Sequence, residues 1–217
     1  MTVTTTTNPG WRIQLAVHRA VRRDVSRLTV ALAGGREIPV EAVRTYWGAT
    51  AAQLHHHHEF EDTVIWPLLG ERLGDRVEAL LARNAHEHLV MASAMDEFDA
   101  ALATLTTDPG AARMALGHMQ EAIGTHLADE EADVLPLTPE AFTMEDIAFF
   151  RAEDAKTMAP DVFLPWMLDD APEADLAFFT GPMPAPVRAQ LESVWMPQRR
   201  VAVEALNLTE SVAAASS

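Results

Sequence analysis

The chain has 217 residues, of which 48% are hydrophobic, so it is long enough to bury the core of one ordinary domain. It contains no cysteine, which excludes disulfides, thiolate-bound metals and iron–sulfur clusters. Its formal net charge of −16 argues against a nucleic-acid partner, because binding to phosphates requires clustered lysine and arginine.

The first ten residues, MTVTTTTNPG, are polar and rich in threonine. They lack the basic and apolar regions of a secretory signal, and we expect residues 1–10 to form a disordered tail. No apolar run approaches the roughly 20 residues that cross a bilayer, so we expect neither a membrane span nor a membrane partner. Because nothing directs the chain elsewhere, the sequence indicates a cytoplasmic protein.

The next segment is dominated by strong helix formers, and glycine and proline separate it into four long helices. We expect these helices at about residues 11–33, 40–67, 75–106 and 111–135. The first helix should stop at Gly34-Gly35, and the turn Asp108-Pro109-Gly110 should separate the third from the fourth. Because the connections are short, neighbouring helices should be antiparallel. The pattern predicts an all-α, up-down-up-down four-helix bundle over residues 11–137.

Residues 138–217 have a different composition, because eight prolines divide this segment into short stretches. It also contains two tryptophans and two Phe-Phe pairs, which would be a liability on an exposed surface. We therefore predict an additional C-terminal helical extension that packs on the bundle. The sequence leaves open whether this extension shapes a substrate pocket, forms a dimer interface or covers an apolar face.

The segment LHHHHEFED, residues 54–62, places four consecutive histidines inside a helical pattern of apolar residues. On a helical wheel of about 100° per residue, its polar side chains divide between two faces. The core-facing side chains are His57, His58 and Glu61, and the outward-facing ones are His55, His56 and Glu59. Only part of the histidine run is therefore a candidate for an interior site.

The same count places polar residues on the inward face of each of the other three long helices. His86 and Glu131 point outward on their helices. Because the helix directions alternate, the inward residues fall in one layer to within about one turn. The complete inward set is His18, His57, His58, Glu61, His88, His126 and Glu130.

Five histidines and two glutamates in an apolar layer are costly without a ligand, because each unpaired buried polar group costs about 1–3 kcal/mol. Two divalent ions remove this cost, and nitrogen and oxygen donors suit iron, manganese, zinc, cobalt or nickel. Seven side chains are too few for two octahedral ions, which leaves room for an oxo or hydroxo bridge and an open position. This favours two iron ions, or a mixed iron–manganese pair with the same ligands, over closed four-coordinate zinc.

Four segments of the chain resemble the hemerythrin or HHE cation-binding domain. They are VHRAVRRD around His18, HHEFEDTVIWPLL from His57, EHLVM at His88 and HLADEEADVLPL from His126. The resemblance covers about residues 11–137 and implies a non-heme di-iron centre in a hemerythrin-like bundle. It implies that Glu61 and Glu130 are bridging carboxylates and that His18, His57, His88 and His126 are terminal ligands.

The chain departs from oxygen-carrying hemerythrins on the third helix, where that family has two histidines four residues apart. Here the positions four residues from His88 are Asn84 and Ala92, and His58 is the natural substitute for the missing ligand. Arg22, one turn after His18, is a candidate second-shell residue that pairs with a glutamate or with Asp133.

These features support two functional hypotheses. The first is a di-iron protein that binds or senses O₂, nitric oxide or peroxide. The second is an oxidoreductase that activates O₂ or decomposes peroxide, with an organic substrate in a pocket shaped by the extension. An inert structural metal site is a third possibility, which the open coordination disfavours.

Overall fold

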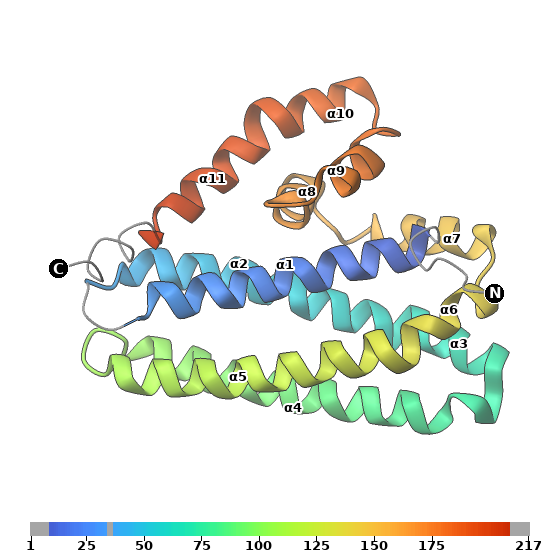
Figure 1. Ribbon diagram of the computed structural model, residues 1–217, viewed down its shortest axis with the longest axis horizontal. Helices are drawn as coiled ribbons and strands as arrows, with labels where there is room; N and C mark the ends of the chain where they lie inside the picture. Colours follow the sequence, from blue (N-terminus) through green and yellow to red (C-terminus); the bar gives the residue numbers. More distant parts are fainter. Residues whose placement is uncertain (1–8, 34–36, 209–217) are drawn as a thin grey trace.

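The computed structural model describes residues 9–33 and 37–208. Its long helices run side by side and form a bundle (Figure 1). They are α1 (Pro9–Ala31), α2 (Val40–Phe60), α4 (Glu78–Ala103) and α5 (Pro109–Asp129). After α2 the chain continues through the π-helical segment η2 (Glu61–Ile65) into α3 (Trp66–Leu73), and the short turn η3 (Gly74–Arg76) leads into α4. The predicted all-α bundle is confirmed.

The C-terminal part consists of short helices, as the proline spacing predicts. After α5 come η4 (Glu130–Val134), η5 (Leu135–Leu137), α6 (Thr138–Ala141), α7 (Met144–Asp154), α8 (Pro160–Leu168), α9 (Glu173–Thr180), α10 (Ala185–Gln190), η6 (Leu191–Trp195) and α11 (Met196–Glu204). Figure 1 shows α8 to α11 lying across the side of the bundle formed by α1 and α2. The division of the chain into domains at residue 138 stays a prediction.

The ends of the helices differ in part from the expected ones. Helix α1 already includes Pro9 and Gly10, which were expected in a disordered tail, and the rest of that tail lies outside the described residues. The expected stop at Gly34-Gly35 also lies outside them. The second expected helix does not end at Pro67 but continues through α3 to Leu73. Proline is tolerated at N1 or N2 of α3 because the N–H groups at the start of a helix have no partner within the helix.

Three π-helical segments, η2, η4 and η6, share one sequence feature: each ends two residues before a proline. The prolines are Pro67, Pro136 and Pro197. A proline ring collides with the carbonyl group four residues earlier, and a widened turn in front of the proline relieves that collision. Segments η2 and η4 begin at Glu61 and Glu130, so the prolines also fix where the helix widens at these two glutamates.

The apolar interior contains two clusters. The larger cluster runs along the bundle and includes Trp166, Met167 and Leu168 of α8, so the extension shares the core of the bundle. The smaller cluster lies around Trp66 and Phe150 and joins α3 to α6 and α7. Within residues 9–33 and 37–208, none of the helices has the length and apolarity required to cross a bilayer.

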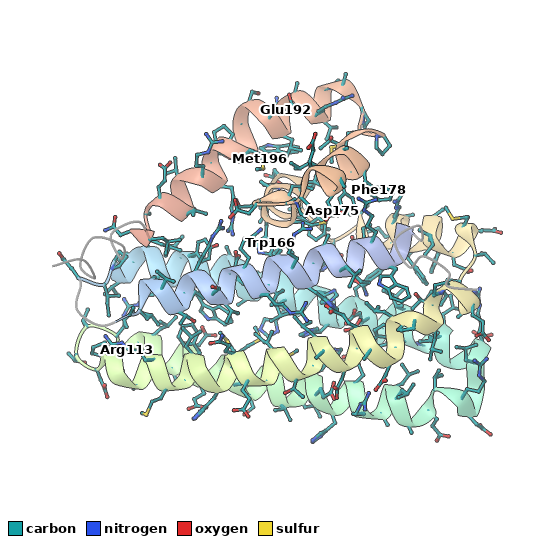
Figure 2. The ribbon with its side chains drawn as sticks, viewed as in Figure 1. Arg113, Trp166, Asp175, Phe178, Glu192 and Met196 are labelled. Atoms are coloured by element: carbon teal, nitrogen blue, oxygen red, sulfur yellow. The ribbon has the colours of Figure 1, made fainter. Side chains whose placement is uncertain are left out.

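Polar contacts also attach the extension to α1. Asp175 of α9 forms ion pairs with Arg12 and Arg19, and Figure 2 shows Asp175 and Trp166 on the side of the extension that faces the bundle. The Trp166 indole N–H donates to the buried carboxylate of Asp24 at 2.9 Å. Arg199 of α11 donates to both oxygens of the same carboxylate, at 2.7 and 2.9 Å. Helices α8, α9 and α11 are therefore anchored to α1 by charge as well as by apolar packing.

Candidate metal centre

Two groups of four buried side chains meet inside the bundle. In each group, one nitrogen or oxygen atom per residue lies within 4.8 Å of the corresponding atoms of the others. The first group is His58, Glu61, His88 and His126, and the second is His18, His57, Glu61 and Glu130. Because Glu61 belongs to both, the groups form one cluster of seven side chains. The structure brings together the whole inward set from the helical wheel, and its role as a ligand set stays a prediction.

The inner atoms of this cluster lack hydrogen-bond partners. The Nε2 atom of each of the five histidines is buried and unpartnered among the described residues, as are Glu61 Oε2 and both Glu130 oxygens. His126 Nε2 lies 3.3 Å from Glu130 Oε2, and His57 Nε2 lies 3.4 Å from Glu61 Oε1. Two ligand atoms that are each about 2.1 Å from one ion lie roughly 3.0–3.5 Å apart. These spacings fit a pair of metal ions.

The outer ring nitrogens of three of these histidines do have partners, and each partner is a carboxylate. His18 Nδ1 lies 2.9 Å from Glu131, His88 Nδ1 lies 3.0 Å from Asp62, and His126 Nδ1 lies 3.2 Å from Glu87. A carboxylate at Nδ1 holds the proton on that nitrogen and leaves the Nε2 lone pair directed inward. These three contacts prepare the histidines to act as Nε2 ligands.

Sequence reasoning missed these three carboxylates. The helical wheel places Glu131 on the outward face, but its carboxylate contacts His18 at 2.9 Å. A sequence signal was available, because Asp62 and Glu131 each follow a core glutamate directly and Glu87 directly precedes His88. In this bundle, a carboxylate next to an inward residue in the sequence is therefore a useful sign of a hydrogen-bond partner for an inward histidine.

Glu61 is held in place by a residue that the sequence did not single out. Gln14 of α1 is itself buried, and its amide donates to Glu61 Oε1 at 2.6 Å. Burial, and next the charge of the nearby Glu130, raise the pKa of Glu61 well above its usual value. Two carboxylates in one dry layer repel each other, and cations between them are the natural compensation.

A profile of the Hemerythrin HHE cation binding domain matches residues 10–138, which is more than half of the chain. The chain belongs to this family. No curated protein and no solved structure gives a match. The family match ends where α6 begins, so the remaining short helices lie beyond the HHE domain.

The imidazoles of this HHE domain are suited to bind cations as neutral ligands. Burial, together with the neighbouring histidines, lowers the pKa of His57 and of His58 well below the usual value. Burial also lowers the pKa of His88, although its contact with Asp62 opposes this. His58 stacks on His88 of α4 with 4.2 Å between the ring centroids, so the two imidazoles lie side by side in the cluster.

The two predicted second-shell residues have different surroundings. Arg22 donates to Glu131 at 2.6 Å, so it supports His18 through a glutamate as expected. Although burial alone would raise it, hydrogen bonds from His18 and Arg22 lower the pKa of Glu131 to about 2. Asp133 instead pairs with Arg83 of α4 at 2.5 Å, and both side chains are partly exposed. Of the two partners that the sequence offered for Arg22, a glutamate or Asp133, the structure therefore has the glutamate.

The remaining four histidines lie outside both groups. His55 and His86 are exposed, His118 contacts Glu97 on the surface, and His56 contacts Asp154 of α7. Asn84, one turn before His88, is buried, and both polar atoms of its amide lack partners among the described residues. One of the two positions four residues from His88 is thus occupied by an amide without partners among the described residues.

Proposed function

We propose that this HHE domain holds two iron ions and uses them to bind or sense O₂, nitric oxide or peroxide. The observation that carries the proposal is the set of eight buried ligand atoms without partners, contributed by five histidines and two glutamates. Leaving so many polar atoms unpaired would cost far more than a folded domain can spare. Two divalent cations satisfy these atoms and compensate the two carboxylates.

Iron is proposed over zinc because of the number and type of donors. The seven side chains offer only nitrogen and oxygen, which suits iron or manganese, and they are too few to complete two octahedral shells. When bound, two adjacent redox-active ions with an open position supply electron exchange with a small molecule. The unsatisfied amide of Asn84, one turn from His88, is available to hydrogen-bond such a molecule.

The side chains around the centre have separate tasks in this proposal. Glu131, Asp62 and Glu87 orient three imidazoles and hold their protons on Nδ1. Gln14 fixes one oxygen of Glu61 and leaves the other free for a cation. The apolar side chains above and below the layer keep bulk water away, which strengthens every charge interaction inside.

A second candidate function, an oxidoreductase that acts on an organic substrate, is favoured by one observation. A largely apolar cavity lies between the bundle and the extension, and its lining includes His57 and Gln14. A carrier or sensor of diatomic molecules needs no such space, whereas an enzyme requires walls for its substrate.

The deciding experiment counts metals and follows the absorption spectrum. The full chain would be reconstituted with ferrous iron without oxygen, and spectra would be recorded before air, after air and again under vacuum. We expect about two irons per chain. A new absorption band that vacuum reverses supports binding, and rapid reoxidation without a stable adduct supports the enzyme. Fewer than one iron per chain would overturn the di-iron proposal.

Pairs of histidine substitutions test the ligand assignment. We expect His88→Ala and His57→Ala to lower the number of metals per chain, because each removes an inward Nε2 donor. The matched controls His86→Ala and His55→Ala remove exposed imidazoles from the same two helices and should leave metal content unchanged. Equal losses in both groups would contradict the assignment of inward and outward faces.

A further inference from the structure

The helices that hold the metal centre form two halves with the same pattern of polar residues. The first half is α1 with α2 and η2, and the second half is α4 with α5 and η4. In each half, one helix carries an amide four residues before a histidine, and the other carries a histidine four residues before a glutamate. These pairs are Gln14/His18 and His57/Glu61 in the first half, and Asn84/His88 and His126/Glu130 in the second. In both halves a π-helical segment begins at the glutamate.

The contacts between the two halves repeat as well. His18 Nε2 lies 3.6 Å from Glu130, and its Nδ1 contacts the acid that directly follows that glutamate. His88 Nε2 lies 3.6 Å from Glu61, and its Nδ1 likewise contacts the acid that directly follows it. The histidine of α1 and the histidine of α4 therefore have equivalent surroundings, each provided by the opposite half.

The amides break this equivalence. In the first half, Gln14 donates to Glu61 Oε1 at 2.6 Å. In the second half, Asn84 takes the place of the glutamine and is 2% exposed, but neither atom of its amide has a partner among the described residues. Glu130 is completely buried, and both of its oxygens also lack partners there. One core glutamate is thus held by an amide, and the other is not.

The length of the side chain explains this difference. Helices α4 and α5 lie side by side (Figure 1), and Arg83, directly before Asn84, lies 3.7 Å from Asp129, directly before Glu130. Asn84 and Glu130 are therefore at the same level of the bundle. Because asparagine has one methylene fewer than glutamine, Asn84 does not make the contact that Gln14 makes in the first half.

Access to the centre requires a side chain to move. The inner nitrogen and oxygen atoms are buried, and His126 Nε2 lies only 3.3 Å from Glu130 Oε2, which leaves no room for a further molecule between them. Movement of Glu61 breaks its hydrogen bond with Gln14, whereas Glu130 has no such bond to lose. Glu61 also belongs to both groups of the centre, and Glu130 belongs to one. Glu130 is therefore the glutamate that moves more easily.

We propose that Glu130 changes position when a small molecule binds to the centre, and that Asn84 is the positioning residue that permits this because it is too short to hold Glu130. The inference rests on the proposed function, since a shifted carboxylate opens a coordination position only at a bound metal ion. It places that position in the second half of the centre, while Gln14 keeps Glu61 fixed between the two ligand groups.

The test compares two substitutions that both enlarge residue 84. The full chain would be loaded with iron and oxidised, and azide, a small anion that binds ferric iron, would be titrated by absorbance. Asn84→Gln supplies a donor that reaches Glu130, so azide affinity should fall about tenfold or more, because a hydrogen bond to a carboxylate must then be broken. The control Asn84→Leu adds bulk without a donor and should lower the affinity by no more than about fivefold, the effect of one lost hydrogen bond.

Two further measurements report on the carboxylates themselves. Infrared difference spectra with and without azide should show a change in carboxylate stretching in the unaltered chain and in Asn84→Leu, and this change should disappear in Asn84→Gln. The reciprocal variant Gln14→Asn releases Glu61 and should bind azide at least as tightly as the unaltered chain. This variant tests the role of amide length even where Asn84→Gln does not fold.

The outcomes separate this inference from the proposed function. Equal loss of azide affinity in Asn84→Gln and Asn84→Leu, with two irons per chain, would overturn the inference alone, because bulk and not the hold on Glu130 would then explain the loss. Weaker azide binding in Gln14→Asn, or an unchanged carboxylate spectrum in Asn84→Leu, would also overturn it alone. Fewer than one iron in the unaltered chain would overturn both proposals.

Discussion

Asp24 and Glu130 are both completely buried carboxylates, but their surroundings differ. Each oxygen of Asp24 accepts three hydrogen bonds. The donors are Arg23, Tyr46, Thr50, Trp166 and Arg199. Neither oxygen of Glu130 has a hydrogen-bond partner among the described residues. The chain satisfies one carboxylate with its own donors and leaves the other open.

The charges near the two carboxylates differ in the same way. Around Asp24 and the nearby Asp169, Arg27 and Arg199 supply positive charge from within the chain. Around Glu130 and Glu61 the neighbours are imidazoles, and the low pKa of His57 and His58 keeps these two neutral. A buried acid that is paired with arginines of the same chain stabilises the fold, and Asp24 holds the extension against α1 in this way. A buried acid among unpaired neutral imidazoles requires cations from outside.

Removal of the metals is expected to have the largest effect. A cation present at a thousandfold excess over its dissociation constant stabilises the folded state by about 4 kcal/mol, and the proposed pair of ions would give more. Denaturant unfolding with and without a chelator would measure the loss. Hydrogen exchange should increase near Glu61 and Glu130 and change little near Asp24, which has its partners in the chain. Equal stability with and without metal would contradict the comparison.

Asp24→Asn tests the other carboxylate. Removing one charge from a buried ion-pair network typically costs about 3–5 kcal/mol, because the partner charges remain buried. We expect a loss of that size in denaturant unfolding, since the Arg199 guanidinium would lose its main counter-charge. The folded fraction should still hold its metals, because Asp24 belongs to neither ligand group. Loss of metal without loss of stability would show that the two clusters are not independent.

Tyr46 gives this network a pH dependence. Burial, and next the charge of Asp24, raise the pKa of Tyr46 to about 12 from a usual value of 10. Above pH 10 the unfolded chain releases this proton while the folded chain retains it, so stability should fall by roughly 2–3 kcal/mol as pH rises from 10 to 12. Tyr46→Phe should show a flatter profile over the same range. Because the chain has a single tyrosine, absorbance reports its titration directly, and parallel profiles would contradict the assignment.

The sequence predicted the bundle and the inward set of the centre for one physical reason. Helical periodicity is local, so His57, His58 and Glu61 could be assigned to one face from the apolar residues of their own helix. The widened turns at Glu61 and Glu130 were not predicted, because a proline limits a helix without stating whether the helix ends or widens.

Helical periodicity does not reveal the carboxylates that contact the histidine Nδ1 atoms, nor the salt bridges of Asp24. Glu131 contacts His18 although the wheel places it outward, because a wheel gives the direction of a residue and not the reach of a long side chain. Arg199 pairs with Asp24 across 175 positions of sequence, and such a pairing depends on how the short helices dock. Long-range charge pairs of this kind follow from tertiary packing and leave no local pattern.

The smallest predicted effect concerns a histidine beside a carboxylate, a kind of contact that occurs both at the centre and on the surface. Asp62→Asn should weaken metal affinity about tenfold to hundredfold, since the carboxylate at His88 Nδ1 orients the ring and raises its basicity. Glu97→Gln is the matched control, because Glu97 contacts His118 Nδ1 at 3.1 Å on the surface, away from both ligand groups. Competition with a coloured chelator would measure both affinities. If the two variants lost affinity equally, the effect of Asp62 would reflect the overall charge of the chain and not the orientation of His88, and the three outer carboxylates would no longer distinguish this centre from an ordinary buried cluster.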